Sequence, residues 1–313
     1  MSHVFSLAKD KSHNKEALVM DNTTQILLDE LIELLSLEPL EDNIFRGQSQ
    51  DLGYGRIYGG QVIGQALAAA RQTVRTGRHV HSFHGYFLRT GDTQLPIIYN
   101  VDCTRNGRSF DTRQVSAIQK GRPIFTLTAS FHIEEDGFDH QDQMPITENP
   151  DVLIDEYAMR LKLTELMPTN LREKALFKLP IEIRPAEPKN PYLPDIRAPM
   201  NKVWFRAAGQ LQDNPDIHTY LLAYASDFQL LATTLFPHGA SFFQSNMQVA
   251  SLDHAMWFHR DFRVDDWLLY VVDSPSASGA RGLARGQIFN QQGFLVASTM
   301  QEGLIRNKLK NCI

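Results

Sequence analysis

The sequence predicts an α+β protein made of two similar halves, each with one helix followed by an antiparallel sheet of four strands. Three observations support this fold class. A helical stretch precedes four strand-like runs in the first half of the chain, and the same order of elements returns in the second half. The chain of 313 residues is also long enough for two domains with separate cores.

The first half opens with a helical stretch and continues with a second, more apolar one. The first, TTQILLDELIELLSLEPL, puts five apolar residues on one face, with Asn22 or Thr23 as the cap: Ile26, Leu27, Leu31, Leu34 and Leu35. The second, GGQVIGQALAAARQTV, carries small residues that let a helix lie close to a sheet. We therefore expect a central buried helix here.

Four strand-like runs follow that helix, namely VHSFHGYFL, PIIYNVDCT, SFDTRQVSAIQ and PIFTLTASFHI. Turn signals separate them at Thr90-Gly91-Asp92, Asn106-Gly107 and Lys120-Gly121. The acidic stretch from Glu134 to Asp151 contains two prolines and has no periodicity, which is typical of a linker. One helix and an antiparallel meander are expected.

The second half begins with a short helix near Tyr157 to Met167 and two strand candidates, PIEIRP and KVWFRAAG. The helical stretch HTYLLAYASDFQLLATTLF comes next. It precedes four further strand-like runs, namely MQVASLDHAMWFH, WLLYVVDSP, ARGLARGQIFN and FLVASTMQEGLIR. The order of elements therefore repeats that of the first half.

An offset of about 171 residues aligns the two halves and indicates an internal duplication. It matches six identical pairs: Phe87 with Phe258, Arg89 with Arg260, Tyr99 with Tyr270, Val101 with Val272, Asp102 with Asp273, and Thr128 with Thr299. A helix wrapped by an antiparallel sheet is the hotdog architecture, and pairing two units covers the exposed sheet edges. We predict a tandem hotdog with the following segments: a polar tail 1–20, a first domain 21–134, a linker with short helices 135–178, a second domain 179–308 and a tail 309–313.

The composition excludes several classes of partner. A net charge of −5 argues against nucleic-acid binding. Cys103 and Cys312 are far apart, so neither a disulfide framework nor a zinc site is indicated, and a cytoplasmic location fits. No secretory signal and no run of 18 apolar residues occurs, so we expect no membrane span.

The familiar hydrolase and cofactor motifs are absent from the sequence. It contains no G-x-S-x-G, no HExxH, no P-loop and no intact G-x-G-x-x-G. The pairs His81/His84 and His254/His259 have spacings that point to opposite faces of a strand, so we predict no metal site. No cofactor is expected.

Three polar residues lie instead in apolar elements of the second half. Asp227 occurs within a helical stretch of Leu, Ala, Tyr and Phe, and Ser251 and Gln301 occur in strand-like runs. Each is costly to bury without a hydrogen bond. One such residue alone is as readily a locally satisfied group as a functional one, but the three together favour a site.

The sequence resembles the acyl-CoA thioesterase II family of double-hotdog enzymes. The resemblance rests on FRGQSQDLG, YGGQVIGQAL, VHSFHGYFLRTGD, LLAYASD, LDHAMWFHR and LVASTMQEGLIRN and covers roughly residues 25 to 308. It implies that Asp227, Ser251 and Gln301 are the catalytic residues. The family usually has threonine at the middle position, so Ser251 keeps the hydroxyl but lacks the β-branch that fixes its rotamer.

The resemblance implies hydrolysis of fatty acyl-CoA to free fatty acid and CoA. Asp227 would activate a water, and Ser251 and Gln301 would hold that water in line with the thioester carbonyl. Laying YGGQV against YASDF places Gln61 opposite Asp227; since glutamine cannot act as a base, one catalytic site per chain is expected. Gly60, Gln61 and His81 are candidate substrate contacts.

Two other functions remain open on the sequence. A hotdog-type enoyl-CoA hydratase is suggested by Asp213-Asn214-Pro215-Asp216-Ile217-His218, although its spacing differs from the hydratase pattern. The chain could also be a non-enzymatic acyl-CoA binding module, since a fold does not fix a function. The family resemblance further implies a homodimer or homotetramer. The acyl chain length and the residues that bind the CoA phosphates are left open.

Overall fold

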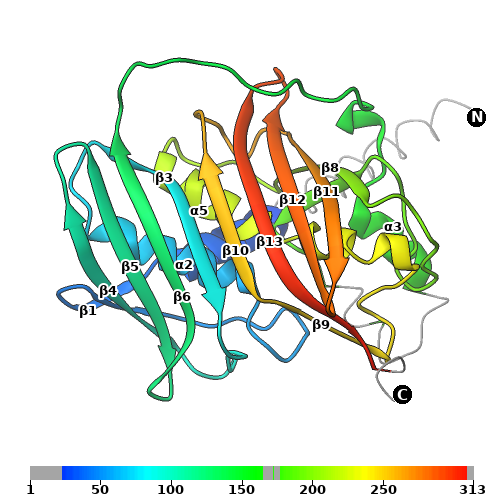
Figure 1. Ribbon diagram of the computed structural model, residues 1–313, viewed down its shortest axis with the longest axis horizontal. Helices are drawn as coiled ribbons and strands as arrows, with labels where there is room; N and C mark the ends of the chain where they lie inside the picture. Colours follow the sequence, from blue (N-terminus) through cyan, green and yellow to red (C-terminus); the bar gives the residue numbers. More distant parts are fainter. Residues whose placement is uncertain (1–22, 165–171, 173–176, 309–313) are drawn as a thin grey trace, which may run out of the picture.

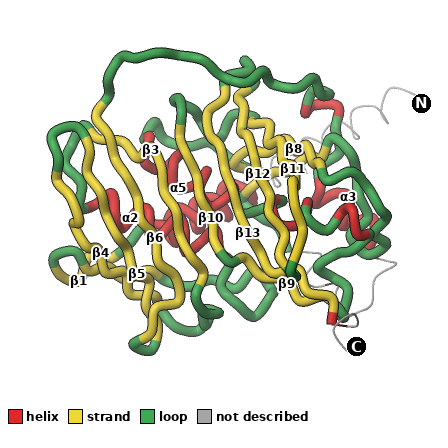
Figure 2. The backbone as a smooth tube through the Cα atoms, viewed as in Figure 1, coloured by secondary structure: helices red, strands yellow, loops and turns green. Residues whose placement is uncertain are grey.

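The computed structural model describes residues 23–164, 172 and 177–308, so the predicted tails 1–20 and 309–313 lie outside the described residues. The strands form one continuous antiparallel sheet that lies in front of a layer of helices (Figures 1 and 2). The sheet order is β1-β2-β4-β5-β6-β3-β10-β13-β12-β11-β8-β7, with β9 paired to β13. The predicted α+β fold of two helices wrapped by antiparallel sheets is confirmed.

The first half begins with a helix over residues 23–35 and two short strands, followed by the predicted central helix and four strands. Its elements are β1 (Glu38–Glu41), β2 (Ile44–Gly47), α2 (Gly59–Gln72), β3 (Arg78–Phe87), β4 (Ile97–Asn106), β5 (Phe110–Gln119) and β6 (Arg122–Ile133). Leu28, Leu31 and Leu35 form the buried face of the first helix, whereas Ile26 is 56% exposed and was wrongly predicted to lie on that face.

The second half repeats this plan after a connecting region that holds η1 (Pro150–Val152) and α3 (Glu156–Leu163). Its elements are β7 (Ile181–Pro185), β8 (Met200–Ala207), α5 (Pro215–Ser226), α6 (Leu230–Thr233), η3 (Phe236–His238), β9 (Met247–Ser251), β10 (Asp253–Phe258), β11 (Leu268–Ser278), β12 (Arg281–Asn290) and β13 (Leu295–Asn307). None of the helices in the described part of the chain is long and apolar enough to cross a membrane.

The strands confirm the internal repeat and refine its alignment. β5 and β12 are offset by 171 residues at both ends. Arg113 and Ala284 are counterparts at this offset. Ala129 lies opposite Arg113 and Gln301 lies opposite Ala284, so Ala129 and Gln301 are also counterparts, and the offset in β13 is 172. The predicted match of Thr128 with Thr299 is therefore wrong by one residue; Thr128 is exposed and Thr299 is buried.

The two halves join through both layers. In the sheet, β3 of the first half pairs with β10 of the second. In the helical layer, α2 and α5 pack together in opposite directions: the start of α2 lies against Tyr224 near the end of α5, and Arg71 near the end of α2 pairs with Asp216 at the start of α5. The central helices are therefore shared by one core.

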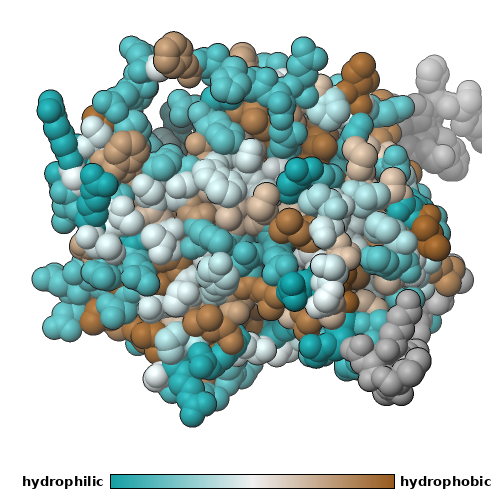
Figure 3. Space-filling model, in the orientation of Figure 1, coloured by the Kyte–Doolittle hydropathy of each residue, from teal (hydrophilic) through white to brown (hydrophobic). Residues whose placement is uncertain are grey.

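The acidic linker stretch has neither helix nor strand over residues 134–149 and is attached to the outer face of the second half. Gln141 hydrogen-bonds to the backbone of Gly293 and Leu295, and Glu148 O accepts from Trp204 Nε1. In Figure 1 it is the green segment that runs from β6 towards α3. Polar and apolar side chains are mixed on the sheet face seen in Figure 3.

Two local irregularities in the second half depart from the sequence prediction and both position the site. The predicted single helix is broken after Ser226, because Gln229 adopts a left-handed backbone with φ of 72° before α6 begins. The predicted single strand MQVASLDHAMWFH is split into β9 and β10 at Leu252, where the register with β13 shifts by one residue.

Candidate active site

Asp227 lies at the C-terminal end of α5, not inside a helix as its sequence context predicted. Its carboxylate receives two hydrogen bonds that come from opposite halves of the chain. Oδ2 accepts from the backbone N–H of Gly60 at 3.0 Å, and Oδ1 accepts from Nε2 of Gln301 at 2.7 Å. Both halves are therefore needed to hold this carboxylate.

Glycines allow the two central helices to approach this closely. A Cβ on Gly60 would lie 2.2 Å from the carbonyl oxygen of Tyr224, and a Cβ on Gly59 would lie 2.7 Å from Oδ2 of Asp227. Tyr58, which precedes α2, donates its hydroxyl to the same Tyr224 carbonyl at 3.0 Å. The first turn of α2 is thereby fixed against the last turn of α5.

The surroundings of Asp227 act on its pKa in both directions. Burial raises the pKa above its ordinary value, and the hydrogen bonds from Gln301 and Gly60 and the charge of Arg56 lower it. The N-terminus of α2 adds a favourable dipole for a negative charge. The net effect is a raised pKa, so the Asp227 carboxylate is a stronger base than an ordinary aspartate.

Ser251 and Gln301 reach the same side of the sheet through the bulge at Leu252. Ser251 lies opposite Gly303, and Gly303, Gln301 and Thr299 alternate on the buried face of β13. Without the extra residue, Ser251 would face the other way, because side chains alternate along a strand. Gln301 is 0% exposed, and its Oε1 has no hydrogen-bond partner in the described part of the protein.

A cavity of about 990 Å³ opens beside Asp227 and Ser251, and Gln301 is not among its lining residues. Asp227, Ser251 and Gly59 line it, together with apolar side chains from both halves such as Val62 and Phe87. This volume accommodates an extended ligand, since pockets for small molecules commonly measure about 300 to 1,000 Å³. Asp227 and Ser251 lie at the wall of a largely apolar space, an arrangement typical of an active site.

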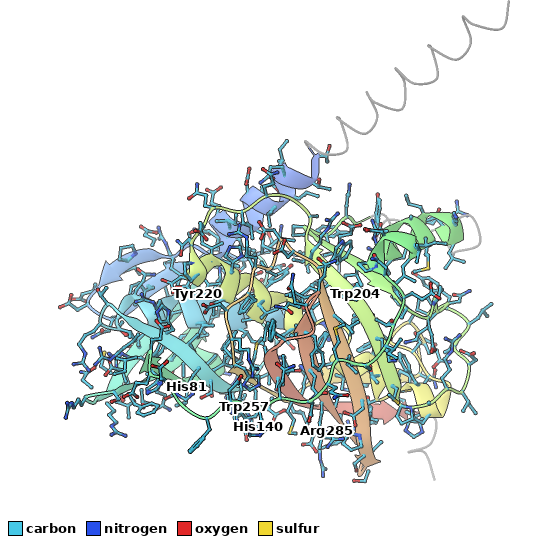
Figure 4. All side chains as sticks on the ribbon, turned by 90° about the horizontal axis from the view of Figure 1, so that it is seen from above. His81, His140, Trp204, Tyr220, Trp257 and Arg285 are labelled. Carbon is cyan, nitrogen blue, oxygen red and sulfur yellow. The ribbon has the colours of Figure 1, made fainter. Side chains whose placement is uncertain are left out.

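The other predicted contacts lie elsewhere or have different partners. The backbone N–H of Gly60 donates to Asp227. Gln61 is buried, and its side-chain amide is hydrogen-bonded to the backbone of Gln48 and Gln50. His81 bonds to Ser130 Oγ at 2.8 Å and packs beside Phe110. It is not among the residues that line the cavity, and Figure 4 shows it at the sheet, apart from Tyr220 in the helical layer.

The predicted equivalence of Gln61 and Asp227 is wrong. Gln61 lies in the first turn of α2, whereas Asp227 is the C-cap of α5. The C-cap of α2 is Thr73, which is therefore the first-half counterpart of Asp227. The short repeat YGGQV/YASDF misled the alignment because it matched the start of one helix with the end of the other.

Comparison with known proteins identifies the family. Residues 171–304 match the acyl-CoA thioesterase family model, and residues 48–132 match the acyl-CoA thioesterase N-terminal domain. Acyl-CoA thioesterase 2 of Haemophilus influenzae is 45% identical over 280 residues, which is 90% of this chain and 98% of that protein. The chain belongs to the acyl-CoA thioesterase II family.

Solved structures agree with this membership. An acyl-CoA thioesterase II from Mycobacterium marinum superposes with a TM-score of 0.72 at 43% identity, covering 88% of this chain and 98% of that one. A hot dog fold protein of unknown function from Alicyclobacillus acidocaldarius has a TM-score of 0.71 at 17% identity, over 88% of this chain and 98% of its own, and supports the fold alone. As a member of this thioesterase family, the chain is a thioester hydrolase.

The residues behind the hydratase alternative have structural roles in this thioesterase. Asn214 caps α5 and Pro215 is its first residue. His218 is buried and accepts a hydrogen bond from the backbone N–H of Val264 at 3.2 Å. None of the three lines the cavity that holds Asp227.

Sequence reasoning weighed His254 only as a possible metal ligand and missed that it lies behind the site. His254 is fully buried, contacts Ser226 Oγ at 3.0 Å and stacks on Phe83. Burial lowers its pKa to about 3, so it is neutral at ordinary pH and ties the end of α5 to β10. Among the described residues, no three His, Cys, Asp or Glu side chains converge to hold a metal ion.

Proposed function

We propose that this enzyme hydrolyses fatty acyl-CoA to free fatty acid and CoA by direct attack of water activated by Asp227. The observation that carries the proposal is the Asp227 carboxylate, held by Gly60 and Gln301 at the wall of a cavity large enough for an acyl chain. A passive binding tunnel has no need for a carboxylate whose pKa is raised by burial.

The reaction needs one base and one positioned water. Asp227 takes a proton from the water while the water oxygen forms a bond to the thioester carbonyl carbon. The hydroxyl of Ser251 and the amide of Gln301 orient the water and the carboxylate. When the tetrahedral intermediate collapses, the carbon–sulfur bond breaks, and the proton held by Asp227 returns to the departing thiolate to give CoA.

The developing oxyanion needs hydrogen-bond donors that are already in place. Gly59 begins α2 and lines the cavity beside Asp227, so we infer that its backbone N–H is one such donor. Its lack of a side chain keeps the approach open, because a Cβ there would meet the Asp227 carboxylate.

One active site per chain follows from this proposal, because the first half has no carboxylate at the end of its central helix. We also infer assembly into a homodimer or homotetramer through the outer sheet face, where Tyr86 is 52% and Trp257 is 41% exposed on neighbouring strands. Light scattering that gives a monomeric mass would overturn the assembly. A cytoplasmic location remains a prediction from the cysteine content.

The proposal is tested by measuring thiol release from a series of short to long acyl-CoAs with the wild type and Ser251→Ala. If Ser251 only orients the water, the variant retains measurable hydrolysis, reduced about 10- to 100-fold, and rapidly quenched wild type shows no acyl adduct by intact mass. An acyl group trapped on Ser251 would replace direct attack by a covalent route. Absence of thiol release from every thioester would remove the hydrolase proposal.

A further inference from the structure

A second group of polar side chains lies at the wall of the same cavity, outside the proposed catalytic trio. It consists of Lys189, Asn201, Gln229 and Glu156, all of which line the cavity. These residues come from four segments: the loop after β7, the start of β8, the break between α5 and α6, and the start of α3. Four separate segments thus place hydrogen-bonding groups in one region of a largely apolar cavity.

The hydrogen bonds run in one direction through this group. Lys189 Nζ donates to Asn201 Oδ1, Asn201 Nδ2 donates to Gln229 Oε1 at 3.1 Å, and Gln229 Nε2 donates to Glu156 Oε2 at 3.2 Å. An ammonium group has three donors, and this chain of bonds occupies one of them. The ammonium also lies 3.9 Å from the centre of the Phe236 ring, so its other neighbour is aromatic.

Three carboxylates, Glu187, Glu156 and Asp195, raise the pKa of Lys189 from a distance, and two of them also lie near arginines. Asp195 forms an ion pair with Arg197 at 2.6 Å, and Glu156 lies 3.9 Å from Arg160. In the part of the chain that the structure describes, no carboxylate lies within ion-pair distance of Lys189. Burial is the main reason that the pKa of Lys189 is lowered to about 8. A partly buried cation without an anion is unfavourable unless a ligand supplies one.

The backbone at Gln229 adds a second sign of function. Its left-handed φ of 72° is a strained conformation for a residue with a side chain, and such strain is concentrated at ligand sites. Gln229 follows Asp227 by two residues along the chain, and both line the cavity. Its amide bonds to Asn201 and Glu156 hold the strained turn in place.

We propose that Lys189, Asn201 and Gln229 form a binding subsite for an anionic oxygen group of the substrate, remote from the thioester. This rests on the proposed hydrolysis at Asp227. Two parts of an acyl-CoA can supply such a group: a carboxylate at the far end of the acyl chain, or a phosphate of CoA. Lys189 binds the anion directly, and the two amides fix the position of the ammonium.

The experiment measures kcat/KM for three substrates with one acyl length: a straight-chain acyl-CoA, its ω-carboxy counterpart, and the acyl-pantetheine, which lacks every phosphate. The variants are Lys189→Met, Lys189→Arg and, as the matched control, Lys202→Met. Lys202 is on β8, its Nζ donates to Ile146 O, and it does not line the cavity. We expect Lys202→Met to resemble the wild type on all three substrates and Lys189→Arg to stay within about threefold.

The pattern of losses identifies the source of the anion. A fall of about 10- to 100-fold for the ω-carboxy substrate alone assigns the subsite to the acyl end. A fall for both CoA substrates, with acyl-pantetheine unchanged, assigns it to a phosphate. No loss with any substrate, or an equal loss with all three, overturns the subsite. Failure of the proposed hydrolysis is read separately, from acyl-pantetheine turnover by the wild type and Asp227→Asn.

Discussion

The two ends of the α2–α5 helix pair occupy equivalent places in a duplicated fold but carry opposite chemistry. At one end, the C-cap of α5 is Asp227, which faces Gly60 in the first turn of α2. At the other end, the C-cap of α2 is Thr73, and Arg71 in the last turn of α2 pairs with Asp216 in the first turn of α5. A carboxylate at a cavity wall in one place corresponds to a hydroxyl in the other.

The strands beside the two helix ends differ in the same way, because polar residues of the second half correspond to apolar residues in the first. The pairing of equivalent strands makes Val80 the first-half counterpart of Ser251 and Ala129 that of Gln301. The first half also has a register shift, between Val80 and Ser82. All three proposed catalytic positions are therefore different in the first half. The scaffold is shared by both halves, and the side chains decide which end has a site.

A buried arginine occupies the inactive end. Arg113 is 1% exposed; it donates from Nε to Thr73 Oγ1 at 2.8 Å and from Nη2 to Thr73 O at 2.9 Å. Arg113 lies opposite Ala129, whereas its counterpart Ala284 lies opposite Gln301. The large polar side chain is thus on β5 in the first half and on β13 in the second, where the cavity lies next to the helix end.

The largest expected effect on this contrast is on stability. Arg113→Met should lower the free energy of unfolding by about 3 kcal/mol, because it removes a buried guanidinium that donates hydrogen bonds to oxygens of Thr73, Arg105 and Asn106. We expect kcat of the folded variant to stay within about twofold. Denaturant unfolding, with the exposed Arg122→Met as control, measures the change, and an equal loss in both variants would contradict the structural role of Arg113.

Gln301→Ala gives the active end the residue found at the inactive one. We expect kcat/KM to fall about 10- to 100-fold, since the charge-assisted hydrogen bond to Asp227 is lost. That bond lowers the pKa of Asp227, so its removal raises the pKa further and moves the acidic limb of the pH–rate profile to higher pH. Rates measured across pH check both effects. An acidic limb that keeps its position or moves to lower pH would show that Gln301 does not act on the carboxylate.

The close helix contact is specific to the active end and should be sensitive to one methyl group. Gly60→Ala should reduce stability by about 1–3 kcal/mol and lower kcat, because the new Cβ forces α2 away from Tyr224 and lengthens the bond to Asp227. Gly137→Ala is the control, since a Cβ there meets nothing within 4 Å. Thermal melts and thiol release compare the two, and matching behaviour would count against the contact.

The smallest effect is expected at the position where this chain has serine instead of the usual threonine. Ser251→Thr keeps the hydroxyl and adds the β-branch that restricts its rotamer. We expect kcat to remain within about threefold of the wild type at saturating acyl-CoA. A loss of more than tenfold would mean that the cavity wall at β9 has no room for the methyl group.

Much of this contrast was predictable from residue patterns, and the reasons for the rest are local. The turn at Lys120-Gly121 and the small residues of α2 predicted the hairpin and the central helix correctly. The break after Asp227 was not predictable, because Gln229 is not a residue type that signals a left-handed turn. The bulge at Leu252 likewise depends on pairing with a distant strand. The Lys189 subsite joins residues from four segments, and no short motif marks it.

The central claim is that hydrolysis is confined to the Asp227 end of the helix pair. The most direct test measures single-turnover thiol release by Asp227→Asn and Asp216→Asn, two identical substitutions at opposite ends of that pair. We predict a loss of at least about 10²-fold for Asp227→Asn, because the base is removed. We predict a rate within about threefold for Asp216→Asn, whose carboxylate forms an ion pair with Arg71 across the helices. An Asp227→Asn variant that keeps more than about a tenth of the wild-type rate, or an equal loss at both ends, would contradict the claim.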